Sequence, residues 1–339
     1  MTMALACSLL AAALAEAAPS AAGAPPQVGG LVADKAAQDG EIWLTGSLFS
    51  NTAATLPKGH ILIEPYLYDS ITTGSFSAAG SRSAQPVQHG VRQLTLILYG
   101  LTDRLTLGAL PQFGYNDTSA LSGRSRVGFG DLPLRVQYKI NDFTAGRFMP
   151  TVSVAFDLIL PTGAYQNLGS FAPNALGTGA HTARLATYLQ RNFPIPGIRT
   201  LRARLNISYS ISSRPSVAGR SSYATPPRFR GQARLGDAFS LLAATEFSLT
   251  QNWAVALDYI YARAGKTVIS GDAATRTGAP EGYVSYRRIF PRSESFELAP
   301  AVEYNLSSRV GLIAGASISL WGRNSPAGIR PAIALNTVF

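Results

Sequence analysis

The side chains that most often carry catalysis or bind metals are few and widely separated in this sequence. The three histidines, His60, His89 and His181, show no H-E-x-x-H motif or other close spacing of zinc ligands. The single cysteine, Cys7, lies in an apolar N-terminal stretch, so the rest of the chain has no thiol for a disulfide, a metal site or a nucleophile. The sequence also lacks a G-x-S-x-G elbow and a Walker loop. We therefore expect no catalytic residue, no metal and no cofactor.

Other ionisable residues are more informative, because they follow a period of two. In residues 131–140, apolar side chains at the even positions alternate with polar ones, among them Arg135 and Lys139. Residues 202–211 and 253–261 repeat the alternation. A period of two places successive side chains on opposite faces of a β-strand. Each segment is therefore predicted to be a strand with one apolar face.

If the apolar faces contact lipid, the opposite faces must line an internal lumen. An Arg or Lys at mid-bilayer on the lipid face would cost about 2–4 kcal/mol, a cost that charges in the lumen avoid. Two arrangements stay open for these charges: a closed network of salt bridges, or a polar pathway for solutes. The residues predicted to line the lumen are Glu64, Arg104, Arg135, Lys139, Asp157, Arg184, Arg202, Arg204, Glu246, Asp258, Glu297, Glu303 and Arg330.

Alternating segments recur after residue 60, and most reach the 9–11 residues that a strand needs to cross a bilayer. Short connections alternate with longer polar ones, as in bacterial outer-membrane barrels. The predicted fold class is all-β, a transmembrane antiparallel up-and-down β-barrel of about 12 strands. Residues 282–290 also alternate, and we interpret them as part of a loop or a hairpin above the membrane. Barrel strands are predicted at 60–68, 91–100, 103–115, 129–140, 149–160, 181–191, 200–212, 238–249, 252–264, 295–305, 309–320 and 329–339.

Composition argues against other classes of protein. The chain of 339 residues is 46% apolar and 14% charged. Its longest apolar stretch, residues 3–15, is shorter than the roughly 20 residues of a transmembrane helix. The formal net charge of +10 is dispersed, with one basic pair at Arg287 and Arg288. Because nucleic-acid binding usually needs clustered basic residues, we expect no nucleic-acid partner.

The N-terminal region divides into two parts. Residues 1–17 have the apolar core and small residues of a secretory signal peptide. Residues 18–58 are rich in Ala, Gly and Pro and are predicted to be a mobile extension or a plug, ahead of a barrel at 59–339. The extension has one apolar cluster, within residues 42–49, which either packs at the mouth of the barrel or inserts into its lumen.

The chain ends with an alternating strand whose last residue is Phe339. A terminal aromatic residue in this position resembles the assembly signal of outer-membrane barrels. The signal peptide, the long strands and this ending together predict the outer membrane of a Gram-negative bacterium. The expected partners are outer-membrane lipid and lipopolysaccharide, the barrel assembly machinery and a small-molecule substrate.

Several short motifs follow one another in the barrel region. They are Gly128-Phe129-Gly130-Asp131 followed by Leu134, Tyr138 and Lys139, then Pro161-Thr162-Gly163, Pro300 with Tyr304, and Gly322-Arg323-Asn324. In this order they resemble the outer-membrane proteins of the phenol-degradation meta-pathway (MetA) type, from about residue 60 to the end. The resemblance implies a channel or transporter for passive uptake of small, often hydrophobic or aromatic, compounds. Two other functions stay open: a structural or adhesive barrel with a blocked lumen, and a lipid-acting barrel enzyme.

Overall fold

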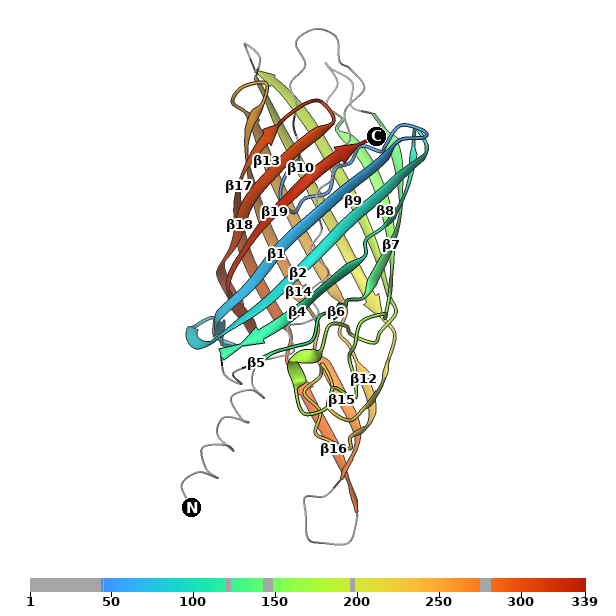
Figure 1. Ribbon diagram of the computed structural model, residues 1–339, viewed down its shortest axis with the longest axis vertical. Coiled ribbons are helices and arrows are strands. Elements are labelled where there is room, and N and C mark those ends of the chain that lie inside the picture. The colour runs from blue at the N-terminus through green and yellow to red at the C-terminus, as the bar shows by residue number, and fades with distance from the viewer. Residues whose placement is uncertain (1–43, 45, 120–122, 143–148, 196–198, 275–281) are drawn as a thin grey trace.

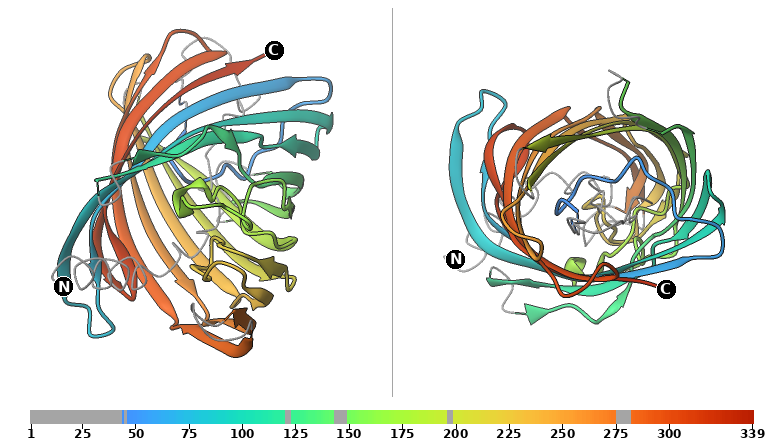
Figure 2. Two further views of the ribbon diagram at one scale, coloured as in Figure 1. Left: turned by 60° about the horizontal axis from the view of Figure 1, so that its bottom comes forward. Right: turned by 90° about the horizontal axis from the view of Figure 1, so that it is seen from above.

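The computed structural model describes residues 44, 46–119, 123–142, 149–195, 199–274 and 282–339. Within these residues, antiparallel strands form a closed barrel (Figure 1, Figure 2). The ring closes at β1, which pairs with β2 on one side and β19 on the other. The wall consists of β1 (Ile61–Phe76), β2 (Arg82–Thr102), β3 (Leu105–Ala109), β4 (Gln112–Thr118), β5 (Gly123–Arg124), β6 (Gly128–Phe129), β7 (Leu132–Asn141), β8 (Thr151–Leu160), β9 (Thr182–Ile195), β10 (Arg199–Ser212), β13 (Ala238–Ser248), β14 (Trp253–Ala264), β17 (Ser293–Asn305), β18 (Val310–Arg323) and β19 (Ser325–Val338).

Two strands of the wall are interrupted. A break before Pro111 separates β3 from β4, and a break at Gly130 and Asp131 separates β6 from β7. Pro111 has no N–H for the ladder. The carboxylate of Asp131 accepts hydrogen bonds from the N–H groups of Gly163 (3.0 Å) and Thr178 (2.8 Å), which ties this break to the β8–β9 connection. With β3–β4 and β5–β6–β7 each counted once, the described residues form twelve barrel strands, and the predicted fold class is confirmed.

The first hairpin is much longer than its apolar pattern indicates. The predicted strands at 60–68 and 91–100 are too short, because β1 and β2 stay paired through residues 69–90 as far as Phe76 and Arg82. This distal part is mostly polar, since it extends beyond the apolar band, and backbone pairing continues there together with side-chain contacts such as that of His89 with Asp69. Hydrophobic alternation therefore reports the part of a strand that meets lipid and misses the rest.

A second sheet stands on the rim that carries the long connections, which we call the loop rim. It contains β11 (Ser216–Ala218), β12 (Arg230–Arg234), β15 (Thr267–Ala274) and β16 (Tyr283–Phe290), in that order. Residues 283–290 are thus a strand of this loop-side sheet, outside the barrel wall, at the bottom of Figure 1. The sheet has its own apolar core of Val217, Tyr223, Phe229, Ala233, Ile269, Ala273 and Phe290.

Along most of the wall, apolar side chains point outward and polar ones inward. In β7, Leu134 is 38% exposed and Val136 44%, whereas Arg135 and Gln137 between them are each 4% exposed. Trp253 and Tyr304 form an outward aromatic pair, with ring centroids 4.6 Å apart, near the opposite rim, which we call the turn rim. An apolar outer surface with aromatic residues toward its edge is typical of a transmembrane barrel. No helix in the described part of the chain is long and apolar enough to cross a membrane.

Candidate functional site

The lumen of the barrel contains part of the chain that precedes β1. Residues 46–57, which we call the luminal segment, run inside the ring, as the blue trace in the right view of Figure 2 shows. Every residue from Ser47 to Leu56 is buried. The segment leaves the lumen at the turn rim, where it passes so close to Gly100 that a Cβ there would lie 2.1 Å from the Pro57 carbonyl oxygen. The predicted signal peptide, residues 1–17, lies outside the described residues.

Polar side chains of the wall hold the luminal segment by its peptide groups. The Asn51 N–H donates to Oδ1 of Asn206 (2.6 Å), and Nδ2 of Asn206 donates back to the Asn51 carbonyl (3.0 Å). Nε2 of Gln137 donates to the carbonyls of Thr52 (3.0 Å) and Ala54 (3.2 Å). These contacts satisfy buried peptide groups that have no strand partner, as burial requires.

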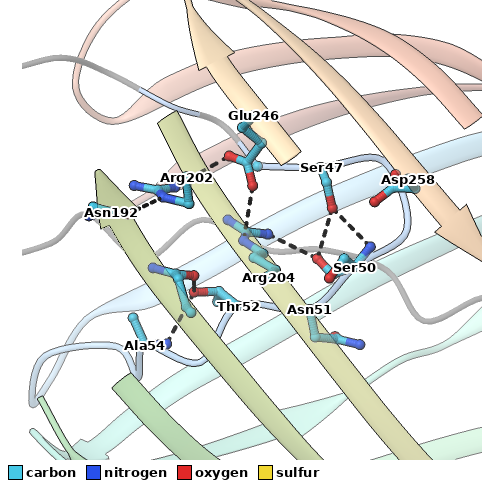
Figure 3. Close-up of polar contacts among 12 residues, drawn as sticks. Ser47, Ser50, Asn51, Thr52, Ala54, Asn192, Arg202, Arg204, Glu246 and Asp258 are labelled. Carbon is cyan, nitrogen blue, oxygen red and sulfur yellow. Dashed lines mark hydrogen bonds and ion pairs between the residues drawn. The ribbon is translucent and has the colours of Figure 1, made fainter. Parts of the chain in front are cut away.

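Charged side chains also hold the segment. The guanidinium of Arg204 donates through Nη1 to the Ser50 carbonyl at 2.9 Å, as seen in Figure 3. The N–H groups of Gly46 and Phe49 donate to carboxylates of the wall, to Glu303 at 3.3 Å and to Asp258 at 3.1 Å. Gly46 has φ +126°, and Arg204 lies 3.4 Å from where a Cβ would be, so glycine suits this position for both reasons.

The wall charges also pair with one another in two clusters. In the first, Asp157 accepts two hydrogen bonds from Arg135 (2.7 and 3.0 Å) and lies 3.4 Å from Nη1 of Arg184. The remaining Arg135 nitrogen, Nη1, donates to Oδ1 of Asn51 at 2.6 Å, which connects this cluster to the luminal segment. Buried charges need such partners, because an unpaired ion in a low dielectric is costly.

The second cluster is centred on Glu246 (Figure 3). Its carboxylate lies 3.0 Å from Nε of Arg204 and 3.5 Å from Nη1 of Arg202. Nε of Arg202 donates to Asn192 at 3.1 Å. Arg204 therefore belongs both to this ion cluster and to the contact with Ser50.

One side of the lumen is apolar. The inward faces of β1 and β2 present Leu62 and Tyr66, and Leu94, Leu96 and Leu98, all of them buried. These side chains form one apolar cluster with four residues of the luminal segment, Leu48, Phe49, Ala54 and Leu56. The lumen thus has a mainly apolar wall at β1 and β2, where Glu64 is also buried, and a charged wall that runs from Arg135 of β7 to Glu303 of β17.

Twelve of the thirteen residues predicted to line the lumen fall into three groups. Glu297 and Arg330 are partly buried and form an ion pair at 3.0 Å, with the Arg330 guanidinium 4.7 Å from the ring centre of Phe49. Lys139 is partly buried near the turn rim, where it pairs with Asp142 at 2.6 Å. The third group is buried in the interior: Glu64, Arg135, Asp157, Arg184, Arg202, Arg204, Glu246, Asp258 and Glu303.

Arg104 does not line the lumen, and its prediction is wrong. It is exposed in the tight turn between β2 and β3, after a register shift between Gly100 and Thr102. Side chains alternate between the inward and outward faces only within a regular strand, and this turn interrupts the strand. Sequence reasoning also missed the uncharged contacts to the luminal segment, Asn206, Gln137, Thr106 and Gln190, although they have inward parity. Selecting inward residues by charge alone left them out.

The described residues contain no cluster of three or more His, Cys, Asp or Glu side chains that could hold a metal ion. His89 contacts Asp69 at 2.7 Å (Nδ1 to Oδ2) on the β1–β2 hairpin, and His60 and His181 are exposed. The polar side chains of the lumen instead hold a peptide segment inside the barrel.

Asn206→Leu should loosen the luminal segment. It removes the two hydrogen bonds to the Asn51 peptide and the one from the Ser50 hydroxyl, each worth about 1 kcal/mol. We expect channel openings in planar bilayers to become more frequent by about tenfold or more. Ser210→Ala, on the inward face of the same strand and in contact with Arg184, is the control and should behave as wild type. Equal opening frequencies in all three proteins would contradict this role of Asn206.

One solved structure supports the barrel fold, and two others are more distantly similar. An outer-membrane channel of Pseudomonas putida F1 is 18% identical, with a TM-score of 0.63 over 85% of this chain and 98% of the other. The toluene transporter TodX of Pseudomonas putida is 14% identical, with a TM-score of 0.38 over 92% and 97% of the two chains. The translocator domain of the autotransporter NalP from Neisseria meningitidis is 12% identical, with a TM-score of 0.41 over 83% and 88%. Among curated proteins, none matches the chain.

The family model described as "Putative MetA-pathway of phenol degradation" matches residues 90–332. The match extends from the middle of β2 into β19 and so spans most of the barrel. It includes the Gly128-Phe129-Gly130-Asp131 motif, whose aspartate ties the broken strand to the β8–β9 connection. The resemblance predicted from the sequence is confirmed, and the chain belongs to this family.

Proposed function

We propose that the protein is an outer-membrane channel for the passive uptake of small hydrophobic or aromatic compounds, closed at rest by the luminal segment. The observation that carries the proposal is the two-sided lumen, in a chain whose family is named for phenol degradation. An aromatic solute could slide along the Leu and Tyr side chains of β1 and β2. Its polar substituents would face the charged wall.

The luminal segment is suited to move because the barrel does not depend on it. The ring of strands closes through β1 and β19 without any contribution from residues 46–57. The segment crosses the lumen as a single chain, held by side-chain hydrogen bonds and two apolar clusters. The buried arginines of the wall keep their partners Asp157 and Glu246 when the segment leaves, whereas Glu303 and Asp258 lose the hydrogen bonds from its peptide groups.

We further infer that the barrel sits in the outer membrane of a Gram-negative bacterium, in contact with its lipid and lipopolysaccharide. Phe339 would act as the signal for the assembly machinery. Its position supports this role, because Phe339 and Ile61 exchange backbone hydrogen bonds of 2.8 and 3.2 Å at the seam that closes the barrel. The terminal residue thus lies at the pairing between β1 and β19 that closes the ring.

Uptake by cells tests the substrate class. Cells that express the protein should take up a labelled monoaromatic compound faster than cells without it, and uptake should rise linearly with concentration. Leu96→Ser places a hydroxyl on the apolar wall and should slow this uptake several-fold while leaving sugar permeability unchanged, since Leu96 is buried in the apolar cluster and carries no charge. Uptake equal to that of cells without the protein would instead favour a structural barrel. Release of fatty acid from lipid would favour an enzyme.

A further inference from the structure

The loop-side sheet has a basic face that the channel function does not use. Its apolar residues Ala233, Ile269 and Phe290 point into the core under the sheet, so the alternate residues point away from it. On this outer face, Ser270 of β15 lies opposite Gln232 of β12 and Arg287 of β16. Polar donors from three neighbouring elements therefore meet around one serine.

These side chains surround a cavity of about 330 Å³ on the sheet. Three arginines, Arg214, Arg234 and Arg287, line it together with the hydroxyl of Ser270 and the amide of Gln232. All three arginines are exposed residues. The cavity is thus lined by a formal charge of +3 and by two further hydrogen-bond donors, a composition that favours binding of an anion.

None of the three arginines forms an ion pair within the described part of the chain. The acidic residue of this face, Asp272, is opposite a fourth arginine, Arg230, in the strand register. In the lumen, by contrast, the buried arginines are paired with Asp157 or Glu246. The cavity arginines therefore keep their hydrogen-bond donors available to a ligand.

We propose that this cavity binds the phosphate group of a phosphomonoester. A guanidinium can donate two parallel hydrogen bonds to such a group, and one arginine already satisfies the two oxygens of a carboxylate. Three arginines exceed what a carboxylate needs, whereas a phosphomonoester offers three terminal oxygens and close to two charges. A phosphorylated sugar of lipopolysaccharide and a free phosphate ester share this chemistry.

Binding to the full-length protein in detergent tests the site. The probes are inorganic phosphate, lipopolysaccharide, and the same lipopolysaccharide after enzymatic dephosphorylation, each followed by calorimetry. The double variant Arg234→Gln/Arg287→Gln should weaken phosphate-dependent binding by at least about tenfold. The double variant Arg220→Gln/Arg309→Gln removes the same charge from exposed positions outside the cavity and should bind as wild type. Heat-modifiable mobility in gels confirms that each variant is folded.

The pattern of binding identifies the source of the phosphate. Tight binding of lipopolysaccharide that is lost on dephosphorylation supports a lipid-borne phosphate, and saturable binding of inorganic phosphate alone supports a soluble one. The proposal is overturned if wild type binds no phosphate-bearing probe, if the cavity variant binds as well as wild type, or if benzoate competes as strongly as phosphate. None of these readouts depends on transport, so the channel proposal stands or fails separately.

Discussion

A chain that starts at Lys58, without the luminal segment, should form a barrel that conducts nearly all the time. The deletion removes every residue from Ser47 to Leu56 from the interior and leaves the hydrogen-bonded ring of strands intact. Eight-stranded barrels are filled by side chains, whereas barrels of 16–18 strands hold wide channels, so twelve strands should leave an intermediate pore. We expect open probability in planar bilayers to rise on the order of tenfold or more over the full chain, a larger effect than that of Asn206→Leu.

Two controls separate an open lumen from a damaged barrel. Heat-modifiable mobility should show that the truncated chain is folded. Asn206→Leu should have no further effect in the truncated chain, because the residues that it contacts, Ser50 and Asn51, are gone. A folded, truncated barrel that conducts no more than the full chain would refute the role of the luminal segment as a plug.

Leu134→Arg should nearly abolish insertion of the folded barrel. Leu134 is exposed on the outer surface, between Ala109 of β3 and Leu158 of β8. An arginine on the lipid face costs about 2–4 kcal/mol near the middle of the bilayer and about 0–1 kcal/mol near its edge. Ile140, which shares this outward face of β7, lies next to the end of the strand at Asn141. Ile140→Arg should therefore insert almost normally.

The measurement is the folded fraction recovered after refolding into lipid vesicles at a series of urea concentrations. Leu134→Met, which keeps the position apolar, should match wild type. If Leu134→Arg and Ile140→Arg lose folded barrel to the same extent, the depth assigned to β7 in the membrane is wrong. If neither does, its outward face does not meet lipid.

The inward or outward orientation of most wall side chains could be predicted from the sequence, because the alternation of apolar and polar residues is a local property. In residues 131–140 the neighbours of each side chain in sequence decide which face it occupies, and the structure places Leu134 outside and Arg135 inside. The same reasoning is incomplete for β2, where Leu94, Leu96 and Leu98 face inward and Ile97 and Tyr99 face outward. A strand that is apolar on both faces carries no parity signal, so the apolar side of the lumen was not predicted.

The sequence by itself therefore determined the class of fold, the family and, for most of the wall, which faces meet lipid, since all of these depend on short-range pattern. The tertiary structure alone decided which distant residues meet: that Asn51 is held by Asn206, that Arg135 shares Asp157 with Arg184, and that three arginines gather on the loop-side sheet. Such contacts depend on the stagger between strands and on closure of the ring. Stagger and closure are set by the packing of the whole barrel, which no single segment of sequence encodes.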